Sequence, residues 1–136
     1  MAPLIYVAAS VPLFIGSAAF LVLNLVFGIG EDGTPKGALL YTVGIFAVMG
    51  FLLVSLFVPS IRGTYGDRVG SVLVSSSALM LTLTSTLWNP WNWFFVAVWV
   101  LLVAVDVLYL RRVQIELGMT QEQTWSPDSL SKRYLP

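Results

Sequence analysis

Four apolar stretches, each long enough to cross a lipid bilayer, occupy most of this 136-residue chain. They are Leu4–Phe27, Ala38–Val58, Val69–Leu87 and Trp91–Leu110, and together they contain one formally charged side chain, Asp106. A membrane-spanning helix needs roughly 20 mostly apolar residues to cross the hydrocarbon layer. We therefore predict an all-α, multi-pass integral membrane protein whose four transmembrane helices form an antiparallel bundle.

The predicted bundle leaves little of the chain for anything else. Residues 1–118 hold the four spans and their short loops, and the last helix should run on to about residue 117 and stop at Gly118. The third and fourth spans are joined by a very short turn at Trp88-Asn89-Pro90, so they should be antiparallel neighbours. Residues 119–136 are expected to form a short cytoplasmic tail.

Composition excludes several classes of function. Only 10 % of the residues are charged, and the formal net charge is zero, so no basic surface is available for nucleic acid. The chain has no Cys and no His. It therefore lacks the usual ligands for haem, copper and zinc, and the usual general base. We expect no catalytic residues, no cofactor, no metal site and no nucleic-acid partner, and an enzyme is the least favoured class.

Basic residues predict the orientation. In a four-span topology the N-terminus, the second loop and the tail lie on one side, with six Lys and Arg residues against Lys36 alone on the other. The six are Arg62, Arg68, Arg111, Arg112, Lys132 and Arg133. Because cytoplasmic loops carry excess positive charge, both termini should be cytoplasmic. Aromatic residues should then anchor the outer interface through Trp88, Trp91 and Trp93, and the inner one through Tyr109.

Small side chains mark one face of the third span. They are spaced by four, three, four and three residues, which places them on one seam: Ser71, Ser75, Ala78, Thr82 and Ser85. Membrane helices associate by close packing of small residues, so the third helix should lie at the centre of the packing. Similar seams occur in the first span at Ala9, Pro12, Gly16 and Ala19, and near the second at Gly37, Gly44 and Ala47.

The hydroxyl groups of the third span leave a second interpretation open. They could line a path for a small polar solute, which is the feature a small transporter or channel would need. Ser and Thr can instead satisfy their hydrogen bonds by donating to the preceding turn of their own helix. The structural interpretation, in which the seams hold helices together, is favoured.

Asp106 is the most informative single residue, because a carboxylate within a membrane span is costly and indicates function by default. One interpretation is an interfacial ion pair with Arg62, Arg68 or Arg111. Two others are a proton- or cation-binding carboxylate and a polar contact to another subunit.

Helical geometry favours the subunit contact. Asp106 falls on the same side of its helix as Trp99, roughly opposite Ala97 and Ala104. If the alanines pack inside the bundle, Trp99 and Asp106 point outward and form a partner-contact face. The seam residues of the third span are further candidates for contacts with a partner.

These observations favour a non-catalytic integral-membrane subunit that packs with larger partners or with copies of itself in a membrane assembly. The alternative is a small transporter or channel that uses the Ser- and Thr-rich third span and Asp106.

Overall fold

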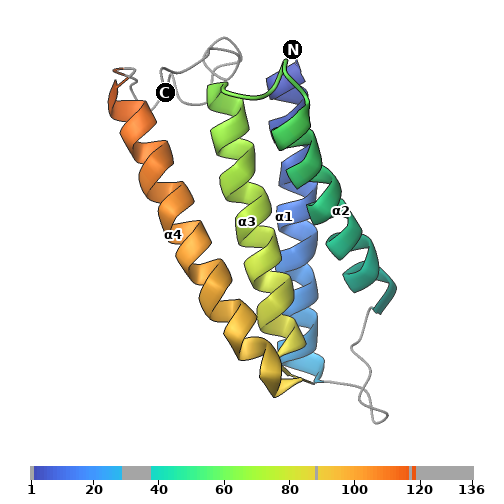
Figure 1. Cartoon of the computed structure of the whole chain (residues 1–136). Helices are drawn as coiled ribbons and strands as arrows, with labels where there is room; N and C mark the ends of the chain where they lie inside the picture. Colours follow the sequence, from blue (N-terminus) through green and yellow to red (C-terminus); the bar gives the residue numbers. More distant parts are fainter. Residues whose placement is uncertain (1, 29–37, 88, 117, 119–136) are drawn as a thin grey trace.

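The computed structural model describes residues 2–28, 38–87, 89–116 and 118, and within them the chain is helical with no strand. The helices are α1 (Ala2–Phe27), α2 (Ala38–Phe57), α3 (Tyr65–Ser85) and α4 (Trp93–Glu116), with the short 3-10 helix η1 (Pro90–Asn92) before α4. Successive long helices run in opposite directions and form a bundle (Figure 1). The prediction of an all-α bundle is confirmed.

In the part of the chain that the structure describes, three helices are long and apolar enough to cross a membrane: Pro3–Phe27, Ala38–Phe57 and Pro90–Glu116. They indicate a multi-pass membrane protein. The remaining long helix, α3, is less apolar because it carries Asp67, Arg68 and seven Ser and Thr residues. Its more polar composition is compatible with its place inside the bundle, where the other helices cover it.

Helix α3 begins earlier than the sequence pattern predicted. We expected a loop as far as Arg68 and a span from Val69, but the helix starts at Tyr65. Thr64 caps it, since the Thr64 hydroxyl oxygen accepts a hydrogen bond of 3.1 Å from the Asp67 backbone N–H. The turn before this cap passes through Gly63, whose φ of +82° suits glycine. The extra helical turn places Asp67 and Arg68 in the bundle instead of in a loop.

Helix α3 is the centre of the packing, as predicted, because it contacts α1, α2 and α4. Two buried apolar clusters surround it. The first joins Val7, Tyr65, Val69 and Val113 from α1, α3 and α4. The second joins α1, α2 and α3 through Phe20, Val48, Val74, Ala78 and Leu81. The polar residues of α3 described below, from Asp67 to Ser75, lie on the part of the helix where the first cluster gives way to the second.

The end of the chain lies partly outside the described residues. Helix α4 ends at Glu116, and Gly118 has a φ of +62°, which fits the predicted stop. Residues 119–136, the predicted tail, are not among those described, and neither is Trp88.

Candidate functional site

Asp106 faces helix α3, not the outside of the bundle. Its Oδ2 atom accepts hydrogen bonds from the hydroxyls of Ser75, at 2.7 Å, and Ser71, at 3.3 Å. The expected outward orientation of Asp106 is therefore wrong. The interfacial ion pair of Asp106 stays a prediction; Arg68, one of its candidate partners, pairs with Asp67.

Trp99 also turns inward, against the prediction. Its side chain packs on the second apolar cluster, and it lines a small cavity with Ala78 and Thr82. Ala97 and Ala104, which were expected inside, are exposed. The reason is complementarity of size and polarity. The small seam of α3 leaves room for a large ring and supplies hydroxyl donors to a carboxylate, while an alanine loses little by facing lipid.

The α3 seam thus packs against α4 and η1 along its whole length. Ser71 and Ser75 bind Asp106, Ala78 and Thr82 lie beside Trp99, and Ser85 accepts a 2.7 Å hydrogen bond from the side chain of Asn92. These contacts are made within the chain. Any contact of the seam with another subunit stays a prediction.

A second carboxylate, Asp67, lies in the interior and was not recognised as a site residue from the sequence. It is 1 % exposed. Its Oδ1 accepts from the Ser55 hydroxyl of α2, and its Oδ2 accepts from Arg68 Nη2 at 3.1 Å and from the Gly63 N–H at 3.4 Å. The pattern Thr64-x-x-Asp67 before an apolar run is a capping signature and could have revealed this position.

Arg68 extends the cluster toward α4. Its guanidinium carbon lies 5.4 Å from the centre of the Tyr109 ring, in a cation–π arrangement. Tyr109, predicted to be an interface anchor, is half-buried and packs on the first apolar cluster. The other two anchors that can be placed, Trp91 and Trp93, are 87 % and 58 % exposed.

Tyr6 of α1 completes this polar region. It is 3 % exposed, and its hydroxyl donates to the Phe51 carbonyl of α2 at 3.3 Å. It lies within electrostatic range of Asp67, Arg68 and Asp106. We call Tyr6, Asp67, Arg68 and Asp106, together with Ser55, Ser71 and Ser75, the interior polar cluster. It connects all four long helices.

Other buried hydroxyls are used locally. Several donate to carbonyls one turn earlier in their own helix, at 2.7–2.9 Å: Ser10, Ser17, Ser77, Thr82 and Thr84. Hydroxyls bonded in this way are structural and do not need a polar solute to satisfy them.

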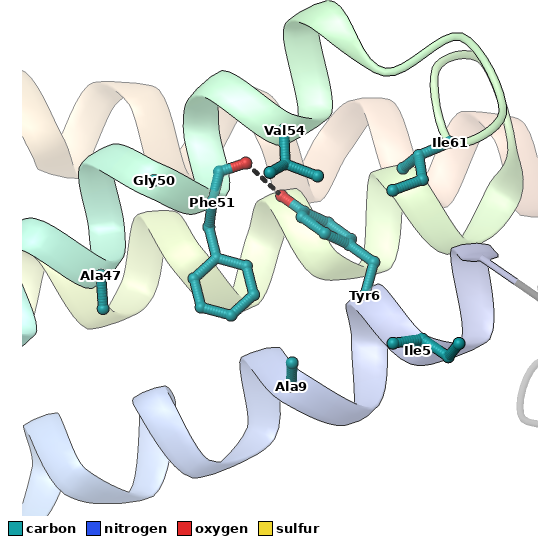
Figure 2. A pocket seen from close by; sticks show the side chains of 8 residues that line it. All are labelled: Ile5, Tyr6, Ala9, Ala47, Gly50, Phe51, Val54 and Ile61. Atoms are coloured by element: carbon teal, nitrogen blue, oxygen red, sulfur yellow. Dashed lines mark hydrogen bonds between the residues drawn. The ribbon is translucent and has the colours of Figure 1, made fainter.

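A hollow groove lies between α1 and α2, and Tyr6 of the polar cluster lines one end of it. One part has a volume of about 490 Å³ and is lined by the residues drawn in Figure 2, which come from α1, α2 and the turn after α2. A second part, of about 280 Å³, continues along the helices and shares Ala9, Ala47 and Phe51 with the first. The lining is almost entirely apolar.

At two positions in this region, close packing within the chain does not explain why the residue is glycine. A Cβ atom added at Gly16 of α1 or Gly50 of α2 would meet nothing within 4 Å. At Gly44, by contrast, an added Cβ would lie 3.0 Å from Leu81 Cδ1. A glycine in a helix interior costs about 1 kcal/mol relative to alanine, so the open space beside Gly16 and Gly50 requires another explanation.

No three His, Cys, Asp or Glu side chains in the described ranges come close enough together to hold a metal ion. Comparison of the chain with protein-family models, curated proteins and solved structures found no match.

Proposed function

We propose that this protein is a non-catalytic integral-membrane subunit, which packs with larger partners or with copies of itself. The observation that carries the proposal is the α1–α2 groove. Its walls contain Ala9 and Gly16 from α1, and Gly44, Ala47 and Gly50 from α2. Small residues let the backbones of membrane helices approach closely, and the open sides of Gly16 and Gly50 leave space for such an approach.

The arrangement of the helices supports four spans. Helix α3 has 21 residues, which corresponds to roughly 30 Å of helix, and it packs along α1 and α4. A helix flanked in this way lies at the same depth as its neighbours. We therefore propose that α3 crosses the membrane as well, shielded from lipid by the other helices.

A test of the groove uses one chemical change at two exposed alanines. Ala9→Leu would fill the groove, whereas Ala104→Leu adds the same bulk to the exposed side of α4. The tagged native protein is purified in mild detergent, and co-purifying proteins are identified and quantified by mass spectrometry. We expect stoichiometric membrane proteins or a homo-oligomer, lost at least tenfold in Ala9→Leu and retained in Ala104→Leu. A wild-type monomer without partners would refute the proposal.

The orientation is a separate prediction, with both termini cytoplasmic. Arg62, Arg111 and Arg112 belong to the end of the bundle where α1 and α3 begin and α4 ends (Figure 1). Single cysteines are placed at Gly33 and Ser131 of this cysteine-free chain and treated with an impermeant thiol reagent on intact cells. Gly33→Cys should react and Ser131→Cys should be protected until the cells are opened. The reverse pattern would contradict the orientation.

One observation favours the alternative function, a small transporter or channel. Asp106 is turned inward and receives hydroxyls from the Ser-rich helix, as a coupling carboxylate would. A cation or proton flux in reconstituted vesicles that disappears in Asp106→Asn, while the assembly persists, would replace the subunit proposal with this one.

A further inference from the structure

The larger part of the α1–α2 groove lies toward the end of the bundle where α1 begins and α2 ends. It runs from Ile61, in the turn after α2, past Tyr6 to Ala9 and Ala47 (Figure 2). Ala47 lies ten residues before Phe57, the last residue of α2, which is a rise of roughly 15 Å along the helix. The hydrocarbon layer of a bilayer is roughly 30 Å thick. This part of the groove therefore extends through about one leaflet.

The lining of this part suits a flexible apolar chain. Its volume of about 490 Å³ is within the range of roughly 300–1,000 Å³ that is typical of small-molecule sites. Tyr6 is the one polar side chain of the lining, and its hydroxyl donates to the Phe51 carbonyl. Beside Gly50 the hollow stays open, since an added Cβ atom would meet nothing within 4 Å. The groove thus offers apolar contact to an occupant from outside the chain.

A positive charge marks the mouth of this groove. The described residues of α1, α2 and the turn 58–64 contain one formally charged side chain, Arg62, which is exposed. Arg62 directly follows Ile61, and its backbone N–H donates to the Val58 carbonyl at 3.1 Å, while the Ile61 carbonyl accepts from the Thr64 hydroxyl at 2.7 Å. These bonds fix the turn beside the mouth. A guanidinium in this position suits a phosphate group, which it binds through two parallel hydrogen bonds.

We propose that the larger part of the groove binds one tail of an anionic phospholipid, whose phosphate group contacts the Arg62 guanidinium. A lipid tail ends near the middle of the bilayer, as the lining of this part does near Ala47, whereas a spanning helix needs the full thickness. A single molecule accounts for both the apolar hollow and the charge at its mouth.

This site goes beyond the proposed function, because the lipid requires no protein partner. The second part of the groove, at Gly16 and Gly44, lies beyond the tail and stays available for the approach of a partner helix. The two proposals are therefore compatible, and each can fail while the other stands.

Photo-crosslinking tests the tail and the headgroup separately. The full chain is reconstituted alone in phosphatidylcholine vesicles that carry a small fraction of a lipid with a diazirine in its tail, either phosphatidylglycerol or phosphatidylcholine. Crosslinked residues are located and quantified by mass spectrometry. In the groove we expect about fivefold more crosslinking with the phosphatidylglycerol probe, the preference that one basic residue gives near an anionic headgroup. Around Ala104, on the exposed side of α4, the two probes should crosslink equally.

Matched variants assign the two parts of the site. Arg62→Gln should bring the ratio of the two probes in the groove close to one, whereas Arg111→Gln, which removes an exposed arginine from the same end of the bundle, should keep it. Gly50→Leu fills the hollow and should lower crosslinking in the groove with both probes. Gly50→Ala adds a single methyl group and should leave most of it.

Three results would overturn the proposal. Equal crosslinking of the wild-type groove by both probes would remove the headgroup contact. An equal loss of the ratio in Arg62→Gln and Arg111→Gln would assign the attraction to the whole end of the bundle and not to a site. Protection of the wild-type groove from both probes would show that protein fills it, and since the vesicles hold this chain alone, that protein would be a second copy.

Discussion

Replacing Gly70 with alanine should strongly destabilise the bundle. A Cβ atom at this position of α3 would lie 2.0 Å from Cε1 and 2.3 Å from Cδ1 of the Tyr6 ring. The ring cannot move aside easily, since it is buried, packs at 5.6 Å from the Phe51 ring and donates its hydroxyl to the Phe51 carbonyl. Overpacking of a core typically costs 1–3 kcal/mol, and we expect Gly70→Ala to cost about 3 kcal/mol. The free energy of unfolding in mixed micelles, measured by titration with a denaturing detergent, provides the test.

Gly50→Ala is the matched control. It makes the same chemical change in a helix interior, where the added Cβ meets nothing within 4 Å. It should stabilise the isolated chain by up to about 1 kcal/mol, because alanine is the better helix former. In the double variant Tyr6→Ala with Gly70→Ala, the cost of Gly70→Ala should largely disappear, because the clashing ring is absent. Equal stability of Gly70→Ala and Gly50→Ala would show that α1 and α3 do not make this contact.

The four helices themselves could be predicted because long apolar runs leave few other solutions. The beginning of α3 could not be predicted, since Ser60, Gly63 and Gly66 are turn formers and make this segment resemble a loop. The Thr64 cap and its bond to Asp67 override that composition. A capping motif of four residues is a weaker pattern than a run of turn formers. The start of α3 was therefore missed, and with it the interior position of Asp67 and Arg68.

The inward face of α4 was predicted incorrectly for a physical reason. Helical periodicity correctly grouped Trp99 with Asp106 and separated them from Ala97 and Ala104, but it does not say which group faces the bundle. Which of the two groups faces the bundle depends on the helix that α4 packs against, which is α3. The small seam already identified on α3 offers hydroxyl donors and space, and these match a carboxylate and a large ring better than two methyl groups.

Helix α1 illustrates the same limit. Its small residues were expected to mark the contact face, yet Ala9, Pro12 and Ala19 are exposed. The buried polar residues are Ser10, Ser17 and Asn24, which repeat every seven residues. In a membrane helix a polar side chain on a regular period marks the interior better than small size does, because polar groups avoid lipid while small apolar ones need not.

The interior ion pair of Asp67 and Arg68 should contribute more to stability than the exposed pair of Arg112 and Glu116. Asp67 and Arg68 have side chains that are 2 % and 24 % exposed. Removing one partner of a buried pair costs about 3–5 kcal/mol, because the remaining charge loses its compensation. Asp67→Ala also removes the acceptor of the Ser55 hydroxyl and of the Gly63 N–H, so the turn between α2 and α3 loses its connection to both helices. We expect a loss of about 3 kcal/mol, near the lower limit, since Arg68 is partly exposed.

The matched comparison is Glu116→Ala, which breaks an exposed ion pair of α4. Arg112 and Glu116 are 75 % and 49 % exposed, and an exposed pair one helical turn apart contributes only about 0.5 kcal/mol. Unfolding in mixed micelles should therefore separate Asp67→Ala from Glu116→Ala by more than about 2 kcal/mol, because only Asp67→Ala leaves a partly buried charge unpaired and removes interior hydrogen bonds. In the double variant Asp67→Ala with Arg68→Leu, the cost should fall below that of Asp67→Ala, because no unpaired charge is left inside. If the double variant were instead the less stable of the two, Arg68 would be held by the Tyr109 ring and its other contacts, and the carboxylate would act mainly by joining α2 to α3.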